Sequence, residues 1–366
     1  MTRAEVLVVG GGIAGLSATW HLARAGVRVH LLEREPLLAS HASARNAAIF
    51  RQIEQSTWHT PLAQRSLGLL SQLDLDVDPV ARTGALYVAA PENVAEIVAR
   101  ACRAGVSCAP LHGPQLPRHS PGLRLGLSAA HVSTDGVMDI HGICQALARG
   151  ARVEGARLEV GAEVRTVLVH RDSVTGVELA DGRVLAADVV LLAAGAWAAR
   201  LGAGCGAPLP IVPHRRHLAL LDVAAPLARG PVVWRLDRGR EVYFRPESGG
   251  VLASPCDEQP WPAEAPATDL DHGTLGRRLA AIAPDLARGA VRRAWACLRS
   301  RTPDHEAVIG ADPRRRGLFW LGALGGRGMT CGLAAGEIAA DCVRGRAPSP
   351  LGLAPARWLR DAGTKE

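Results

Sequence analysis

The chain has 366 residues, 48% of them apolar, so it can bury a large core in two domains or one elaborated domain. Its net charge of +7 comes from scattered arginines, and the one tight run, at residues 314–316, is typical of a solvated loop rather than a nucleic-acid surface. No apolar run approaches the roughly 18 residues of a membrane span, and glycines at 10–12 interrupt the apolar start, so neither insertion nor export is expected. Eight cysteines without a CxxC pair favour reduced thiols, a cytoplasmic location and no metal site.

The first part of the chain has the pattern of a β-α-β unit. A β-branched run at residues 5–9 leads into a glycine cluster, a helical pattern covers residues 13–25, Gly26 ends it, and a second apolar run covers residues 27–32. This order predicts a dinucleotide site, the alternative being a glycine-rich structural turn.

Each glycine of the cluster has a separate task in such a site. Gly10 permits the tight turn, Gly12 lets the backbone approach a pyrophosphate, and Gly15 lets the helix pack closely on the sheet. Glu33 follows about twenty residues later, where a carboxylate accepts both hydroxyls of an adenosine ribose and disfavours a 2′-phosphate. FAD or NAD is therefore expected. The predicted contacts are Gly10, Gly12, Ile13, Ala14, Gly15, Glu33 and Arg34.

A second small, polar segment, ASHASARNAAIFRQ at residues 39–52, runs into a helical pattern. We interpret it as a turn that wraps the phosphates and the flavin ring. The alternative is an ordinary helix with Ser43 as its N-cap. The predicted cofactor contacts are Ser43, Arg45, Asn46, Ala47 and Ala48.

Together with the segment LFWLGALGGRGMTCGLAAGEIAADCV at residues 318–343, the pattern resembles the FAD-dependent D-amino-acid oxidase superfamily, in its glycine oxidase, sarcosine oxidase and D-arginine dehydrogenase branch. The similarity runs the whole length, and its pieces occur in the family's order. Besides the N-terminal unit they are SARNAA, DGVMDIHGICQAL, VLLAAGAWAARL, VPHRRHLALL, REVYFRP, ACLRSRTPD and GGRGMT.

The resemblance implies an α/β fold with a Rossmann-like FAD-binding domain of the glutathione-reductase type and an inserted, β-rich mixed-sheet substrate domain. The FAD-binding domain is expected at residues 1–80, 135–200 and 303–366. The substrate-binding domain is expected at residues 81–134 and 201–302.

The resemblance also adds cofactor contacts from later segments. The AAGAW strand end and the start of GAEV match positions that touch the cofactor. The GGRGMT loop enters a helix expected at residues 334–343, whose free amides would stabilise negative charge on the reduced flavin; the alternative is a glycine-rich hinge. The contacts implied are Val164, Ala194, Gly195, Trp197, Gly326, Arg327, Gly328, Met329 and Thr330.

Three side chains match the family's grip on the substrate carboxylate. Arg299 falls on the main position, and Arg216 and Tyr243 fall on two assisting ones. A planar guanidinium makes two parallel charge-assisted bonds to a carboxylate, which fixes the α-carbon over the ring. Arg216 alternatively pairs with an acid on a neighbouring strand, and Arg301 is either a second clamp or a rim charge.

Cys297 matches the position at which sarcosine-oxidase-like members carry the cysteine that bonds to the flavin 8α-methyl group. In a strand Cys297 shares a face with Arg299, so both could look toward flavin and substrate. We expect non-covalent FAD and a buried, inert thiol, with a thioether as the alternative.

The sequence departs from the D-arginine dehydrogenase pattern where the substrate is held. A predicted helix, IFRQIE, places Ile49, Arg51 and Glu54 at substrate positions where that enzyme type has other residues. Glu54 could receive a cation and Arg51 an anion, or the two could form a solvent-facing pair at i and i+3. Arginine specificity is therefore not inferred.

The activity implied is oxidative deamination of an amino acid, either a D-amino acid or a glycine-like secondary amine. Hydride transfer from the α-carbon to flavin N5 would give an imino acid that hydrolyses to the oxo acid. Dioxygen, a quinone or a partner protein could accept the electrons. The alternatives are a 2-hydroxy acid dehydrogenase, and a flavin subunit or assembly factor active only with a partner chain.

Overall fold

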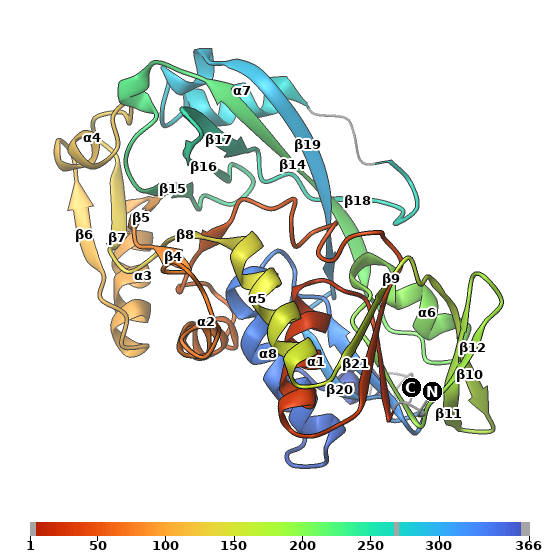
Figure 1. Ribbon diagram of the computed structural model, residues 1–366. Helices are drawn as coiled ribbons and strands as arrows, with labels where there is room; N and C mark the ends of the chain where they lie inside the picture. Colours follow the sequence, from red (N-terminus) through yellow and green to blue (C-terminus); the bar gives the residue numbers. More distant parts are fainter. Residues whose placement is uncertain (1–4, 267–270, 360–366) are drawn as a thin grey trace, which may run out of the picture.

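The computed structural model describes residues 5–266 and 271–359, which form two large β-sheets with helices packed on them (Figure 1). A six-stranded sheet has the order β20-β21-β13-β1-β2-β9, parallel except for β20. All four residues of β1 are buried, as expected of a parallel strand covered on both faces. The strands are β1 (Val6–Val9), β2 (Val29–Glu33), β9 (Arg157–Val160), β13 (Val189–Leu192), β20 (Val308–Ala311) and β21 (Leu318–Gly322).

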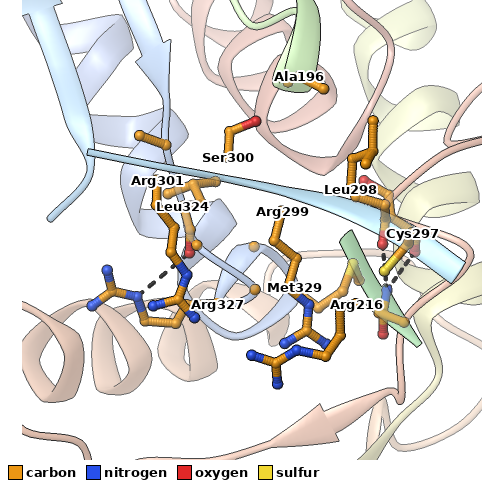
Figure 2. Close-up of a pocket in the computed structure, with 18 of the residues that line it drawn as sticks. Ala196, Arg216, Cys297, Leu298, Arg299, Ser300, Arg301, Leu324, Arg327 and Met329 are labelled. Carbon is orange, nitrogen blue, oxygen red and sulfur yellow. Dashed lines mark hydrogen bonds between the residues drawn. The ribbon is translucent and has the colours of Figure 1, made fainter. Parts of the chain in front are cut away.

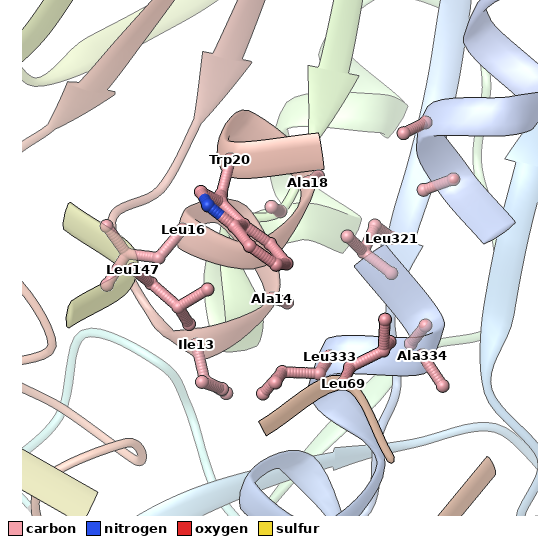
Figure 3. Packing of buried hydrophobic residues seen from close by; sticks show 14 of the residues in the cluster. Ile13, Ala14, Leu16, Ala18, Trp20, Leu69, Leu147, Leu321, Leu333 and Ala334 are labelled. Atoms are coloured by element: carbon pink, nitrogen blue, oxygen red, sulfur yellow. The ribbon is translucent and has the colours of Figure 1, made fainter. Parts of the chain in front are cut away.

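Three helices pack together on one face of this sheet: α1 (Ile13–Arg24), α5 (Ile140–Val153) and α8 (Gly328–Val343). Figure 3 shows their apolar side chains meeting, among them Trp20 of α1, Leu147 of α5 and Leu333 of α8. The Ser17 hydroxyl donates to the Leu333 carbonyl at 3.0 Å. A side chain at Gly336 would collide with Ser17, so this glycine lets the two helices approach closely.

A mixed, mostly antiparallel sheet forms the second body, at the upper left of Figure 1. Its longest ladder joins β14 and β19, which extend toward the six-stranded sheet and place Arg216 opposite Cys297. The strands are β5 (Ala85–Ala89), β6 (Ala109–His112), β7 (Ser128–Val132), β14 (Val212–Asp222), β15 (Val232–Arg235), β16 (Val242–Glu247), β17 (Gly250–Ser254), β18 (Gln259–Pro260) and β19 (Ala290–Arg301).

Shorter elements complete the described chain. One small sheet holds β3 (Ile49–Phe50), β8 (Gly136–Met138) and β4 (Val80–Ala81), and another holds β10 (Val164–His170), β11 (Ser173–Leu179) and β12 (Val184–Ala186). The remaining helices are α2 (His59–Leu70), α3 (Pro91–Arg103), α4 (Gln115–His119), α6 (Ala198–Gly204) and α7 (His272–Ala280), with 3-10 turns at Gly195–Trp197, Ala225–Leu227, Leu286–Arg288 and Pro355–Trp358.

The predicted α/β fold with a Rossmann-like parallel sheet and a mixed sheet is confirmed. Every strand of the mixed sheet lies within residues 81–134 or 201–302. The division into domains at those positions stays a prediction. The arginine run at residues 314–316 lies before β21, where Arg314 pairs with Asp312 at 2.7 Å. None of the described helices combines the length and apolar character that crossing a membrane requires.

Two helix predictions are wrong. The last helix begins at Gly328, six residues earlier than expected, because the GGRGMT loop forms its first turn. The IFRQIE segment is not a helix: Ile49 pairs with Val137 in β8, and the Gln52 amide donates to the Asp135 carboxylate at 3.1 Å. These distant partners satisfy the backbone groups that a helix would have paired locally.

Candidate active site

A cavity of about 1580 Å³ lies between the two sheets and is lined by residues of both. It runs from the glycine turn after β1 to a group of arginines on β14 and β19. Each predicted site residue lines this cavity except Gly15, which lies behind Gly10. The roles assigned to these residues stay predictions.

The glycine turn after β1 packs directly against neighbouring backbone, which only residues without a side chain allow. Gly10 has φ +110°, and a side chain there would lie 2.5 Å from the Ala193 carbonyl oxygen. A side chain at Gly15 would collide with the Gly10 carbonyl. Helix α1 begins directly after Gly12, which gives no side-chain cap. The helix start is therefore a cradle of amides that suits a pyrophosphate.

Glu33 faces the cavity from the end of β2, as predicted. Its two oxygens accept hydrogen bonds from the Gly11 amide at 2.6 Å and the Glu35 amide at 2.9 Å. Each carboxylate oxygen has a further lone pair, so the orientation fixed by these amides still leaves acceptors for ribose hydroxyls.

Trp197 forms one wall beyond Glu33. The Arg34 guanidinium lies 4.0 Å from one ring centroid of Trp197, and the His41 ring lies 4.7 Å from it. Glu35 accepts from both, at 3.0 Å from Arg34 and 2.8 Å from His41. The hydrogen bond from His41 is the main cause of a lowered pKa of Glu35. The buried Nε1 of Trp197 has no hydrogen-bond partner among the described residues, which leaves a donor for a ligand.

The SARNAA segment is a turn braced by its own side chains, and the alternative of a helix capped by Ser43 is wrong. The Ser43 hydroxyl instead accepts from the Ile13 amide at 2.9 Å, so it caps α1 from a distant segment. The Asn46 amide group donates to the Ser43 carbonyl at 2.9 Å, and its oxygen accepts from the Ala48 amide at 2.7 Å. This bracing holds Ala48 at φ +55°.

Arg299 reaches into the other end of the cavity from β19 (Figure 2). Its Nη2 donates to the hydroxyl of the fully buried Tyr243 at 3.4 Å. The loop before α8 passes so close that a side chain at Gly326 would lie 2.8 Å from Nη1 of Arg299. Figure 2 shows Arg216 and Arg299 projecting on the same side of the two strands, with Cys297 buried nearby. The clamp and the flavin-contacting loop predicted from the sequence are thus in direct contact.

Arg216 and Arg301 flank Arg299, and both are bonded to one acid. The same oxygen of Glu258 accepts from Arg216 and, at 2.5 Å, from Arg301. Arg216 thus lines the cavity while it is paired with an acid from the loop after β17, and its assisting role at the substrate stays a prediction.

Arg51 and Glu54 pair with each other. The alternative of a solvent-facing pair is wrong, because both side chains line the cavity and are largely buried, and their proposed contacts with substrate stay predictions. Arg327 lies 3.6 Å from Glu54 and 3.7 Å from Glu306. Carboxylate partners are thus present for four arginines that line this part of the cavity: Arg51, Arg216, Arg301 and Arg327. Arg299 has no carboxylate within 4.0 Å among the described residues.

Three groups at this end had not been predicted. Trp234 lies under the Arg51 guanidinium at 4.0 Å and against the Tyr243 ring at 4.6 Å. Trp234 pairs with Tyr243 across the antiparallel strands β15 and β16. In the sequence, two short strand-like runs separated by a turn are the signal that could have predicted this hairpin. Glu258 lies in an irregular loop, and no local pattern marks it.

Asp135 is the third unpredicted group, and it is fully buried behind the cavity wall, where its charge acts on Arg51. Its carboxylate accepts from the Tyr87 hydroxyl and from the Gln52 amide and side chain, the last at 3.0 Å. Burial raises the pKa of Asp135 to about 6, although these hydrogen bonds oppose the rise. Burial, reinforced by Arg51, likewise lowers the pKa of His59 to about 3, so the imidazole that bonds the Arg51 carbonyl is neutral.

The fold and the cavity define a class of protein: a dinucleotide-binding protein whose cavity carries several arginines at the end away from the glycine turn. The profile of the family described as "DAO: FAD dependent oxidoreductase" matches residues 5–342, and the chain belongs to this family. It is therefore an FAD-dependent oxidoreductase. The glycine cradle, the Glu33 carboxylate and the unpartnered Trp197 donor are a set of groups that fits FAD.

Similar proteins place the chain in the glycine/sarcosine oxidase-like branch. A glycine oxidase of Pseudomonas aeruginosa is 31% identical over 371 residues, covering 97% of this chain and 99% of the relative. A glycine oxidase of Geobacillus kaustophilus is 27% identical over 377 residues, covering 99% and 98%. A solved L-proline dehydrogenase from P. horikoshii has a TM-score of 0.86 at 22% identity over 98% of each chain, which shows the shared fold alone.

Proposed function

We propose that the protein oxidatively deaminates an amino acid, either a D-amino acid or a glycine-like secondary amine, through an imino acid that hydrolyses to the oxo acid. The observation that carries this proposal is the unpaired guanidinium of Arg299, held against the loop that precedes α8. The glycine oxidases among its relatives support an amino acid as the substrate.

Arg299 is the group proposed to bind the α-carboxylate. Its planar fork can donate two parallel hydrogen bonds to the two carboxylate oxygens, while Tyr243 holds one end of the fork in place. Contact with Gly326 fixes Arg299 relative to the loop, so the α-carbon would take one position next to the cofactor. Bound FAD supplies the acceptor for the hydride of the α-carbon.

The electrostatics of this end favour the reactive form of the substrate. Arg216, Arg299 and Arg301 face the cavity, whereas Glu258 is the acid bonded to this group. Nearby positive charge disfavours a protonated amine, so a substrate bound there loses its ammonium proton more easily. A neutral amine needs no dedicated general base at the α-carbon.

The start of α8 would serve the cofactor. Its first residues, Gly328, Met329 and Thr330, line the cavity, and no side chain caps the helix. Free amides and the positive end of the helix dipole would stabilise negative charge on a reduced flavin. We propose non-covalent FAD, with the buried Cys297 packing against Tyr243 and Leu218 as an inert thiol.

The test is an anaerobic visible spectrum of the FAD-loaded protein, titrated with D- and L-amino acids, N-methyl amino acids and 2-hydroxy acids. Bleaching by an amino acid with release of ammonia or amine supports the proposal. Bleaching by a 2-hydroxy acid alone, or by no compound without a partner protein, would overturn it. Arg299→Ala should weaken substrate binding about 30-fold or more, because it removes a charge-assisted fork. Arg293→Ala, an exposed change outside the cavity on the same strand, should bind substrate normally.

A further inference from the structure

We propose that Glu258 restricts the site to substrates with a single carboxylate, because it occupies the two arginines that would otherwise receive a second one. This inference rests on the proposed function. It follows from the pairing at the substrate end, where Arg299 is open and its neighbours Arg216 and Arg301 share Glu258.

The Glu258 carboxylate occupies the position that the carboxylate of a ligand would take between Arg216 and Arg301. One oxygen accepts from both guanidiniums. Arg216 is itself buried, and its Nε donates to the Asp257 carbonyl at 2.7 Å, so it cannot follow a departing partner far. Arg301 is held at its other side, 2.8 Å from the His305 ring. The two guanidiniums thus form a preorganised anion site that the chain fills itself.

The charges around this site show what Glu258 offsets. Burial lowers the pKa of Arg301 to about 10; Glu258 opposes that drop, and Arg216, Arg299 and Arg327 add to it. Guanidiniums this close repel one another and attract any anion within reach. A chain without the Glu258 charge would therefore offer a strong second site to a carboxylate.

The second site is within reach of a small amino acid bound at Arg299. In the ladder of β14 and β19, Arg216 lies opposite Cys297, two residues from Arg299 on the same face. Such diagonal neighbours are about 7–8 Å apart. Long arginine side chains readily close that gap around a dicarboxylic amino acid such as aspartate or glutamate. Glu258 therefore separates monocarboxylic from dicarboxylic substrates by occupying Arg216 and Arg301.

The test compares simple anions on the FAD-loaded protein, which needs no turnover. Acetate and succinate are titrated by calorimetry into the natural protein, into Glu258→Gln and into Glu337→Gln. The Glu337 change is a matched control, since this acid is ion-paired with Arg65 on the outer side of α8, away from the cavity. We expect succinate to bind the natural protein no more tightly than acetate. In Glu258→Gln the succinate-to-acetate affinity ratio should rise about tenfold or more.

Catalysis provides a separate measurement. Anaerobic flavin reduction by aspartate, glutamate and iminodiacetate should accelerate in Glu258→Gln relative to reduction by alanine or glycine. If no amino acid reduces the natural protein, the proposed function fails while the anion titration still decides the role of Glu258. Three results would overturn the inference: tighter succinate binding by the natural protein, an unchanged ratio in Glu258→Gln, or loss of acetate binding in that variant. Glu258→Ala serves as a second variant if Glu258→Gln does not fold, and the same ratio should rise.

Discussion

Replacing Gly326 by alanine should displace Arg299, the proposed carboxylate clamp, without changing any atom of Arg299 itself. Gly326 has φ +91°, and its added methyl group would lie 2.8 Å from Nη1, 2.9 Å from Cδ and 3.1 Å from Cζ of Arg299. Carbon and nitrogen atoms rarely approach within about 3.4 Å without a hydrogen bond, so the guanidinium has to move by several tenths of an ångström.

Gly325→Ala is the matched control for this change. Gly325 is the preceding residue and also has a positive φ, +58°, but its methyl group would meet its nearest neighbours, Cγ of Arg301 and Nη2 of Arg327, at an ordinary 3.6 Å. Both substitutions place a side chain in a left-handed conformation and should cost about 1–2 kcal/mol of unfolding free energy. Only Gly326→Ala displaces the clamp.

The assay measures acetate affinity, FAD content and Tm for both variants. A misplacement approaching 1 Å can cost about 100-fold, so we expect acetate affinity and kcat/KM for an amino acid to fall about 10- to 100-fold in Gly326→Ala. Gly325→Ala should bind acetate as the natural protein does, with a similar Tm to Gly326→Ala. Equal acetate affinity in the two variants at equal FAD content would refute the placement of Arg299 as the clamp.

Three further changes test other parts of the structure. The pKa of Asp135 is raised from 3.8 to about 6 in the folded protein, so the folded state binds this proton more tightly than the unfolded chain does. The contribution of Asp135 to the free energy of unfolding therefore falls by about 3 kcal/mol as the pH rises from about 4 to 6. The Tm of Asp135→Asn relative to the natural protein should therefore rise over that range, and a pH-independent difference in thermal melts would contradict this. If FAD is non-covalent at Cys297, acid precipitation should release all the yellow colour from the natural protein and from Cys297→Ser alike; colour retained in the pellet of the natural protein alone would reveal a thioether. Gly15→Ala should purify without FAD because its methyl group would collide with Gly10, whereas Gly68→Ala, whose methyl group meets nothing within 4 Å, should keep FAD at the same absorbance ratio.

The parts of the site that could be predicted from the sequence depend on short-range geometry. The spacing of Gly10, Gly12 and Gly15 between a strand and a helix determines a cradle within one β-α-β unit. Glu33 follows because the second strand ends where the first does. Resemblance added Arg299 and Tyr243, which come from distant strands and have no shared local pattern.

The parts that were missed depend on contacts between segments far apart in the chain. The IFRQIE segment does not form the helix that its pattern predicts, because the backbone amide of Gln52 bonds to Asp135, 83 residues later. Glu258 could not be predicted from the sequence because it is marked only by its bonds to Arg216 and Arg301. These two arginines come together only when β14 pairs with β19. Periodicity reports which face of an element is buried, and it does not report which charges meet across a cavity.

The hydrogen bond from the Gly325 amide to the Ser300 carbonyl, 3.1 Å long, links the loop before α8 to β19 at the residue next to Arg299. Arg299, the proposed carboxylate clamp, and the loop proposed to contact the flavin therefore belong to one strand-and-loop unit. Arg51, Trp234 and Glu258, which shape the rest of the pocket, belong to three other segments. Libraries that vary those three positions can therefore search for new substrates while the backbone link between the Arg299 strand and the loop before α8 stays intact, which makes this pocket a convenient starting point for directed evolution.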